Sequence, residues 1–370
     1  MGISFLYYGI IVVNTIAFLL GRKIKLIYIP SAFFLILFVM GKRFNGSAIA
    51  YDLESYKNRF ENVDEISTLE IGYKLLNVIG NNILNLSFET FYMILVAIII
   101  ITILVSVNKI KGNYHLLLLC WFIYYVNISM DQLRNQSALA VMMVSIFPLC
   151  YSSKYNVRKV LLFLALASTF HISFVLYAVP LFLTYKKDIG YAVRWFVFFM
   201  AVYLILMFSS STSFFESIIS MFVSKAGDTD KYDAYVGSHT SLSSLASVSI
   251  YVIILLSIYL LKKDNIKYIG ERNNYFCDNI NLFLSFLLFS SILLPFLLVN
   301  AAFYRIVRDL SFIAIIYLGI NSTKETSCLI KRIKILMFSL AISIGWFIFD
   351  IIIKGHFLDY SLYFFENELL

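Results

Sequence analysis

The sequence predicts an all-α, polytopic integral membrane protein with about ten spanning helices plus a broken or re-entrant helix pair. Of its 370 residues, 61% are hydrophobic and only 14% are charged, whereas soluble domains carry charge on about a quarter of their residues. The long segments are uniformly apolar, while the strands of an outer-membrane barrel alternate between apolar and polar residues. We therefore expect a single transmembrane domain over residues 1–370, with external loops at about 41–87 and 211–245.

The expected spans are apolar stretches of up to roughly 20 residues, the length that crosses a bilayer as a helix. The first of them has no basic start and runs long, so it predicts a spanning helix rather than a cleavable leader. The candidate spans lie at about 3–20, 26–40, 88–107, 114–129, 133–150, 191–210, 246–261, 279–299, 302–320 and 335–353.

The net charge of +8 is spread over short loops, which is typical of the positive-inside bias and not of a nucleic-acid binding face. Placing the basic loops in the cytoplasm puts the N-terminus and the loops 41–87, 211–245 and 354–370 outside. The residues that set this orientation are Arg22, Lys23 and Lys25, Lys109 and Lys111, Lys154, Arg158 and Lys159, Lys262, Lys263, Lys267 and Arg272, and Lys324, Lys331, Arg332 and Lys334.

The segment 160–185 has basic residues on both sides, so a single crossing would leave one basic flank outside. Two short helices that meet near Thr169–Ser173, with His171 at the tip, keep both flanks inside. Such a break is tolerated only where it is buried in protein or lines an aqueous cavity. One long tilted helix is the alternative.

The two larger external loops differ in character. The first ends in a stretch with apolar residues at Ile71, Leu75, Val78, Ile79 and Ile83, a spacing that predicts a helix lying at the outer membrane surface. The second, 211–245, is long and rich in Ser, Thr and Asp, which favours a lid.

Three arginines lie in apolar stretches that should not carry charge. Arg305 and Arg308 are three residues apart and share a helix face, and Arg134 begins another span. The orientation above puts all three near the outer membrane face. Because a charge near hydrocarbon is costly and arginine presents a fork of donors suited to phosphate, we interpret them as a clamp for the diphosphate of a lipid-linked substrate. The alternative is snorkelling to headgroups, with Asp131 and Asp309 as local partners.

Candidate catalytic groups come from the acidic external loop and from the apolar segment that breaks. Among four histidines, His171 is the one deep in an apolar stretch, where it can serve as an acid, a base or a hydrogen-bond donor. Asp52, Glu54 and Glu70 are the carboxylates considered as a base for an acceptor hydroxyl, and Asp52 and Glu70 are the two proposed as catalytic. A histidine that only bonds Ser168 or Ser173, and carboxylates that are solvated surface, are the alternatives.

No cofactor and no metal is expected. The four cysteines form no CxxC pair and lie near no histidine at ligand spacing. The phosphate-binding loop, the dinucleotide fingerprint and the HExxH and GxSxG motifs are absent from the sequence. Tyr56 and Tyr73 are candidates for contacts with sugars, or are interfacial aromatics.

Five segments of the sequence form a recognisable series. They are GKRFNGSAIAYDLESYKNRF after the second span, EIGYKLL, MDQLRNQSALAVMMVSI with Arg134 and Gln136, LALASTFHISFVLYAVPLF with His171, and NAAFYRIVRDLSFIAIIYL with the late arginines. Through these segments the sequence resembles the EpsG family of Wzy-type polysaccharide polymerases over roughly residues 40–320.

The resemblance implies a GT-C-like helical bundle that joins oligosaccharide repeat units carried on undecaprenyl diphosphate. It implies a glycosyltransferase of the bacterial cytoplasmic (inner) membrane whose site faces the periplasm or exterior and whose product is O-antigen, capsule or exopolysaccharide. In this reading Gln136 joins Tyr56 and Tyr73 in sugar binding. Expected partners are the lipid-linked glycan, membrane lipid and a chain-length regulator protein, and no nucleic acid. An O-antigen ligase and a flippase of lipid-linked sugars are the alternatives.

Overall fold

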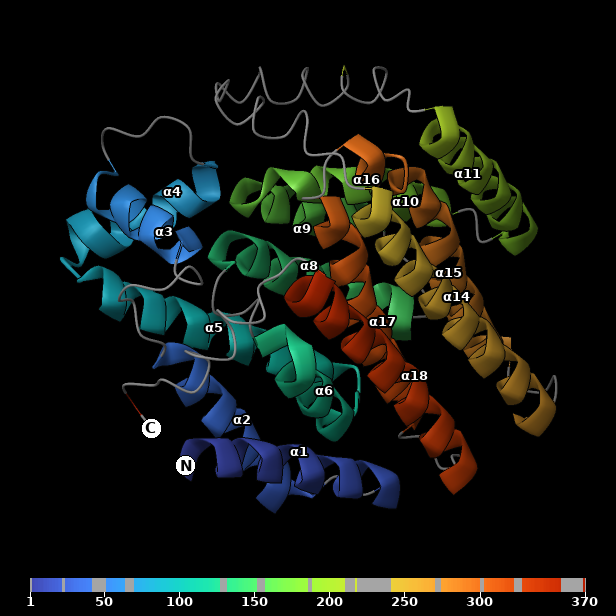
Figure 1. Ribbon diagram of the computed structural model, residues 1–370, viewed down its shortest axis with the longest axis horizontal. Helices are drawn as coiled ribbons and strands as arrows, with labels where there is room; N and C mark the ends of the chain where they lie inside the picture. The colour runs from blue at the N-terminus through green and yellow to red at the C-terminus, as the bar shows by residue number, and fades with distance from the viewer. Residues whose placement is uncertain are drawn as a thin grey trace. The chain divides into compact units, whose positions relative to one another are not determined.

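A computed structural model describes most of the chain, and every segment that it describes is built from helices (Figure 1). The predicted all-α, polytopic architecture is thereby confirmed. The chain divides into two units, and each is described by itself. The described residues are 2–21, 24–41, 51–63, 70–126, 132–151, 157–185, 188–209, 217, 241–269, 274–299, 303–322, 328–353 and 369.

Within these residues, six helices are long and apolar enough to cross a membrane, and three shorter apolar helices accompany them. The six are Gly2–Leu20, Phe88–Lys109, Ile189–Ser209, Leu242–Lys263, Ile280–Val299 and Leu329–Asp350. The shorter three are Lys25–Met40, Tyr114–Tyr125 and Ile172–Thr184. The predicted segments at 133–150 and 302–320 are also helical, as α8 (Leu133–Tyr151) and α17 (Tyr304–Ser322), so the expected total of about ten spans stays a prediction.

Unit 1 comprises residues 1–144, 169–171 and 313–370. Polar caps define where its helices start, because the first N–H groups of a helix need an external acceptor. Ser87 accepts a hydrogen bond from the amide of Thr90, and Asn113 accepts from the amides of His115 and Leu116. The helices of this unit are α1 (Gly2–Leu20), α2 (Lys25–Met40), α3 (Tyr51–Glu61), α4 (Ile71–Val78) with the π-turn η2 (Ile79–Ile83), α5 (Phe88–Lys109), α6 (Tyr114–Cys120) with η3 (Trp121–Tyr125), the first part of α8, the end of α17, and α18 (Leu329–Phe347) with η7 (Ile348–Ile353).

A polar network joins α1, α2 and α6 inside unit 1. His115 Nδ1 lies 2.9 Å from Asn14 Oδ1, and the Asn14 amide donates to Ser31 Oγ at 2.9 Å. The backbone N–H of Ile24 donates to His115 Nε2 at 3.3 Å. Asn14, Ser31 and His115 are all buried. Because each of these polar groups has a partner, the network holds three apolar helices together without leaving a buried donor or acceptor unmet.

Unit 2 comprises residues 145–168 and 172–312. Its core helix is α15 (Asn274–Phe289), which contacts α10 (Ala178–Thr184), α11 (Ile189–Ser209) and α14 (Ser241–Ile269). The hydroxyls of Tyr203 and Ser244 lie 2.7 Å apart and link α11 to α14. Short helical segments complete the unit, namely η4 (Ile172–Tyr177), η5 (Ser290–Leu293) and α16 (Phe296–Val299), together with α9 (Val157–Phe170) and the start of α17.

The predicted break in segment 160–185 is present. Helix α9 ends at Phe170, His171 is not helical, and the chain continues through η4 into α10. Pro180 is the third residue of α10, near the helix start, where a missing N–H costs little. A single long helix over this segment is therefore excluded, while its re-entrant course stays a prediction.

Segment 41–87, which the sequence predicts to be external, contains α3 and α4. The apolar residues Ile71, Leu75 and Ile83 are 76%, 58% and 65% exposed, whereas Tyr73 and Asn77 are fully buried. Helix α4 therefore turns its polar side toward the protein and its apolar side outward, which is typical of a helix on a membrane surface. The predicted lid at 211–245 lies outside the described residues except for 217 and 241–245, as does nearly all of 354–370.

Candidate functional site

Three residues far apart in the sequence meet in unit 1. Nη1 of Arg134, at the start of α8, lies 2.7 Å from Oε2 of Glu70, the residue before α4. Nδ1 of His171, at the break after α9, lies 3.4 Å from Oε1 of the same carboxylate. The Glu70 side chain is 15% exposed and the other two are 17% exposed. One carboxylate thus joins two of the residues that the sequence singled out as diphosphate-binding and catalytic.

A glycine allows this approach. An added Cβ on Gly72 would lie 2.3 Å from Oγ1 of Thr169 and 3.0 Å from its carbonyl oxygen. Any side chain at this position would therefore force the start of α4 away from Thr169. Because Glu70 is two residues before Gly72 and His171 two residues after Thr169, the distance between Glu70 and His171 depends on this close contact.

Two tyrosines support the arginine of the cluster. Cζ of Arg134 lies 5.6 Å from the centre of the Tyr56 ring, within the range of a cation–π contact. The Tyr56 and Tyr73 rings are 5.7 Å apart, and both residues are buried. The guanidinium is therefore held between an aromatic face and a carboxylate, which leaves it little rotational freedom.

The environment of Glu70 keeps it ionised. Burial by itself would raise the pKa of Glu70, but the His171 ring and the Arg134 charge outweigh it and hold that pKa well below its ordinary value. Because the pKa of Glu70 is lower in the folded protein than in the unfolded chain, its ionisation stabilises the fold. This stabilisation is fully present at pH values above the ordinary carboxylate pKa and is lost as the pH falls toward the lowered pKa. At neutral pH, Glu70 is a carboxylate that orients its neighbours and is a weak proton acceptor.

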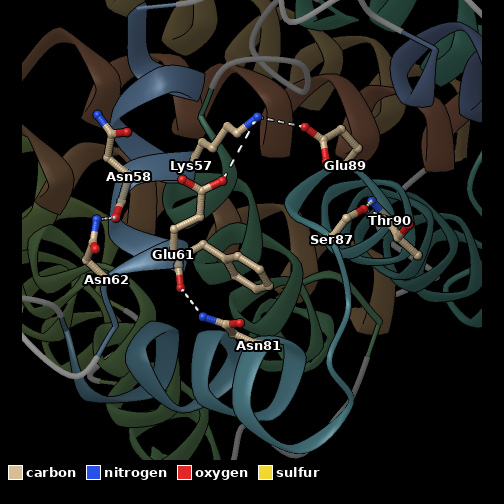
Figure 2. Close-up of polar contacts among 9 residues, drawn as sticks. Lys57, Asn58, Glu61, Asn62, Asn81, Ser87, Glu89 and Thr90 are labelled. Atoms are coloured by element: carbon tan, nitrogen blue, oxygen red, sulfur yellow. Dashed lines mark hydrogen bonds and ion pairs between the residues drawn. The ribbon is translucent and has the colours of Figure 1, made fainter.

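Helix α3 is fixed to the rest of the loop by polar contacts (Figure 2). Nζ of Lys57 lies 3.0 Å from Oε1 of Glu89 at the start of α5. The side-chain amide of Asn81 in η2 donates to the carbonyl of Phe60 at 2.8 Å. The first contact joins α3 to α5, and the second joins α3, which carries Tyr56, to the turn that continues α4, which carries Tyr73.

Segment 41–87 and the start of α8 bury polar atoms that meet no partner in the described part of the chain. They are Nη1 of Arg59, the hydroxyl of Tyr73, both amide atoms of Asn77 and Nε of Arg134. An unmet buried polar group costs about 1–3 kcal/mol, so this concentration makes the region a candidate for ligand binding. Neither Arg59 nor Asn77 was predicted as a site residue from the sequence. Their signal is that Arg59 follows Tyr56 by three residues and Asn77 follows Tyr73 by four, each on the same helix face.

The other two arginines lie in unit 2, on α17. Arg308 is 1% exposed, its Nη1 lies 3.4 Å from the Tyr304 hydroxyl, and its Cζ lies 5.2 Å from the centre of that ring. Arg305 is partly buried, and Asp309 is 3% exposed. A buried guanidinium is costly unless polar groups surround it. Arg308 therefore stays a candidate for diphosphate binding.

The remaining predicted site residues are distributed as follows. Gln136 is buried two residues beyond Arg134 on another side of α8, and the two ion pairs described above for the Glu70 cluster (Glu70, Arg134 and His171) do not include it. Asp52 belongs to α3, but its side chain lies outside the described residues. Because Arg134 belongs to unit 1 and Arg305 and Arg308 to unit 2, their convergence on one headgroup stays a prediction.

Comparison with known proteins gives one match. Residues 26–363, nearly the whole chain, match the EpsG family. No curated protein and no solved structure matches the sequence. The matched range covers all of unit 2, most of unit 1 and every residue of the Glu70 cluster, so the resemblance seen in the sequence motifs is confirmed. The chain belongs to the EpsG family of Wzy-like polysaccharide polymerases.

Proposed function

We propose that this protein joins oligosaccharide repeat units carried on undecaprenyl diphosphate, at the outer face of the bacterial cytoplasmic membrane. The observation that carries the proposal is the Glu70 carboxylate, which holds Arg134 at 2.7 Å and His171 at 3.4 Å inside a polytopic member of a polymerase family. The basic loops support the orientation, because they put residues 41–87 outside.

The reaction transfers a glycan from one lipid carrier to a fresh lipid-linked unit. A hydroxyl of the acceptor sugar attacks the anomeric carbon that links the growing chain to its diphosphate. The new C–O bond forms as the bond to the diphosphate breaks, and undecaprenyl diphosphate leaves with the electron pair. The hydroxyl proton passes to a base, so the step needs one proton acceptor and cations that stabilise the leaving diphosphate.

In this proposal His171 accepts the proton. Nδ1 of its ring faces Glu70, so a proton on Nδ1 leaves the lone pair on Nε2 to act as the base. Glu70 orients the ring and stabilises its charged form, and Arg134 keeps Glu70 ionised. Glu70 is thus a positioning residue rather than the base, because its lowered pKa makes it a weak proton acceptor.

The leaving diphosphate is assigned to Arg305 and Arg308, with Arg134 completing the clamp. Arginine suits this role because its planar fork binds two phosphate oxygens at once. Tyr56 and Tyr73 are buried and their rings pack on each other. Their expected contacts with the sugar are therefore made by the hydroxyl groups and not by the ring faces. Gln136 and Asp52 are kept as expected contacts with sugar and acceptor.

Lipid-linked repeat units that accumulate in a deletion strain provide the substrate for a direct experiment. The purified full-length protein in liposomes should convert them to a ladder of longer glycans and release undecaprenyl diphosphate, and Arg308→Ala should not. In cells, the deletion should leave single-unit glycans on the lipid core. Loss of every glycan from the core indicates a ligase, and movement of unextended units across the liposome bilayer indicates a flippase. Either result would overturn the proposal.

A further inference from the structure

Three polar side chains on α3 and α4 have buried donors that none of the described residues meets. They are Nη1 of Arg59, the hydroxyl of Tyr73, and the amide of Asn77, whose oxygen is also unmet. Tyr73 and Asn77 are both 0% exposed. Buried polar groups are nearly always hydrogen-bonded in folded proteins, so a ligand that offers hydrogen-bonding atoms here would complete three groups that the described residues leave unmet.

The three side chains lie close together. Tyr73 and Asn77 are four residues apart and share one face of α4. Tyr73 packs 5.7 Å from Tyr56 on α3, and Arg59 is three residues beyond Tyr56. At the next turn after Asn77, Asn81 donates to the Phe60 carbonyl at 2.8 Å. One contact between the two helices, Tyr56 with Tyr73, thus comes before Arg59 and Asn77 in the sequence. The other, Phe60 with Asn81, comes after them.

The described charges of this region differ in whether they are paired. Burial raises the pKa of Tyr73, while the positive charges of Arg134 and Arg59 act on its hydroxyl in the opposite direction. Arg134 is neutralised by Glu70 at 2.7 Å. No carboxylate within the described ranges forms an ion pair with Arg59. The group therefore combines one positive charge with phenol and amide donors.

We propose that Arg59, Tyr73 and Asn77 form a subsite that binds an oxyanion of the lipid-linked glycan. Guanidinium, phenol and amide donors suit a group with several acceptor oxygens and one or two negative charges. That group is either the carboxylate of an acidic sugar or the phosphate oxygens of the carrier. The subsite rests on the proposed function for the identity of its ligand, but binding can be measured without turnover.

Two probes distinguish the sources. One is farnesyl diphosphate, which carries the diphosphate without sugar. The other is the free repeat-unit glycan, released by mild acid from the lipid-linked units of a deletion strain. Calorimetric titration of the full-length protein in nanodiscs gives the affinity for each. Arg59→Ala should weaken one of the two by about 10- to 100-fold, the effect of losing a charge-assisted hydrogen bond, and the probe affected identifies the source.

A matched control lies on the same helix. The Glu61 side chain is 52% exposed and its only recorded ion pair in the described chain is with Lys57 at 4.0 Å. Glu61→Ala removes a charge from α3 without touching the three side chains and should leave both affinities within about twofold. Arg59→Lys keeps the charge but loses the fork, so its affinity should fall between those of the wild type and Arg59→Ala.

Asn77→Leu separates a binding role from a structural one. Leucine has nearly the shape of asparagine and removes an amide that the empty protein leaves unmet. The thermal midpoint of the ligand-free protein should therefore stay the same or rise, while the affinity for the probe falls. Tyr73→Phe should behave in the same way, because it keeps the ring and removes the hydroxyl.

Equal affinities in the wild type and Arg59→Ala, or no binding of either probe to the wild type, would overturn the subsite. A lower thermal midpoint in Asn77→Leu with unchanged affinity would do the same. Failure of the proposed function gives a different result: the wild type would bind a probe through Arg59 but make no polymer from lipid-linked units.

Discussion

The described residues of unit 1 include two histidines, His115 and His171, whose surroundings differ in charge. His115 meets a neutral side-chain amide and a backbone N–H, with Nδ1 2.9 Å from Asn14 Oδ1 and Nε2 3.3 Å from the Ile24 nitrogen. His171 meets a carboxylate, 3.4 Å from Glu70, that also pairs with an arginine. Both rings belong to a protein that is mostly apolar, yet only one has a charged partner.

The difference assigns a separate role to each ring. Since the Ile24 N–H donates to Nε2 of His115, the proton of the neutral ring is on Nδ1. A second proton on Nε2 would point at the Ile24 N–H and break that hydrogen bond. The carboxylate beside His171 accommodates the neutral and the charged ring alike. The chemistry of the partners, more than the depth of burial, therefore distinguishes a structural histidine from one that can exchange a proton.

His171→Ala should have the largest effect. Loss of the proton acceptor is expected to lower the polymerisation rate by about 10²- to 10⁴-fold. The Glu70–Arg134 pair remains, so the protein should still insert and fold. Gel analysis of surface glycan length and the initial rate in liposomes measure the change, with membrane abundance determined in parallel. An unchanged chain-length distribution at equal abundance removes His171 from the site.

Gly72→Ala should lower the rate next most, although it alters no functional group. The new Cβ would lie 2.3 Å from Thr169 Oγ1 and push α4 away from His171, and a misplacement of about 1 Å can cost about 10²-fold in rate. Adding Thr169→Ala removes the closest clashing atom, so the double variant should recover part of the activity.

The control for this effect is Gly9→Ala in α1, where an added Cβ meets nothing within 4 Å. It should leave the rate unchanged and slightly favour the helix. A double variant no faster than Gly72→Ala alone would show that the contact with Thr169 does not set the geometry of the cluster.

His115→Ala should reverse the pattern and reduce stability rather than rate. It leaves the Asn14 oxygen and the Ile24 N–H without their present partner, at a cost of about 1–3 kcal/mol each. Thermal unfolding of the purified protein should occur at lower temperature, while the rate per folded molecule stays near that of the wild type. A variant with normal stability and a large loss of rate would contradict the structural role.

Lys57→Ala should have the smallest effect. The Lys57–Glu89 pair is 40% and 42% exposed at its two ends (Figure 2), and exposed pairs contribute about 0–1 kcal/mol. Any loss of stability should shrink further at high salt, because screening weakens the pair in the wild type. A large loss that persists in salt would mean that this contact, and not the aromatic packing, holds α3 in place.

Much of the fold follows from the sequence because bilayer thickness fixes the length of apolar segments. The helices of the predicted segments, the break at His171 and the outward apolar face of α4 all appear as expected. The π-turn at Ile79–Ile83 and the 3₁₀ segment at Ile172–Tyr177 were not predicted, because they depend on how neighbouring helices pack rather than on local pattern.

The site was predicted less completely. Glu70, Arg134 and His171 were each recognised from their residue type in an unusual setting, but the sequence did not indicate that Arg134 pairs with Glu70. Neither Arg59 nor Asn77 was predicted to belong to the site. Pairing and burial depend on which helix faces which, and for α3 and α4 that is decided by the contacts of Tyr56 with Tyr73 and of Asn81 with Phe60.

The most direct test of the central claim is the pH dependence of the initial polymerisation rate in the wild type and in Glu70→Gln. If His171 takes the proton and Glu70 only positions the His171 ring, the variant is slower at every pH. Its rate still falls as the pH is lowered, as in the wild type, because His171 becomes protonated; this fall is the acid-side loss of rate. If Glu70 is itself the base, that acid-side loss disappears in Glu70→Gln. Its disappearance would contradict the account.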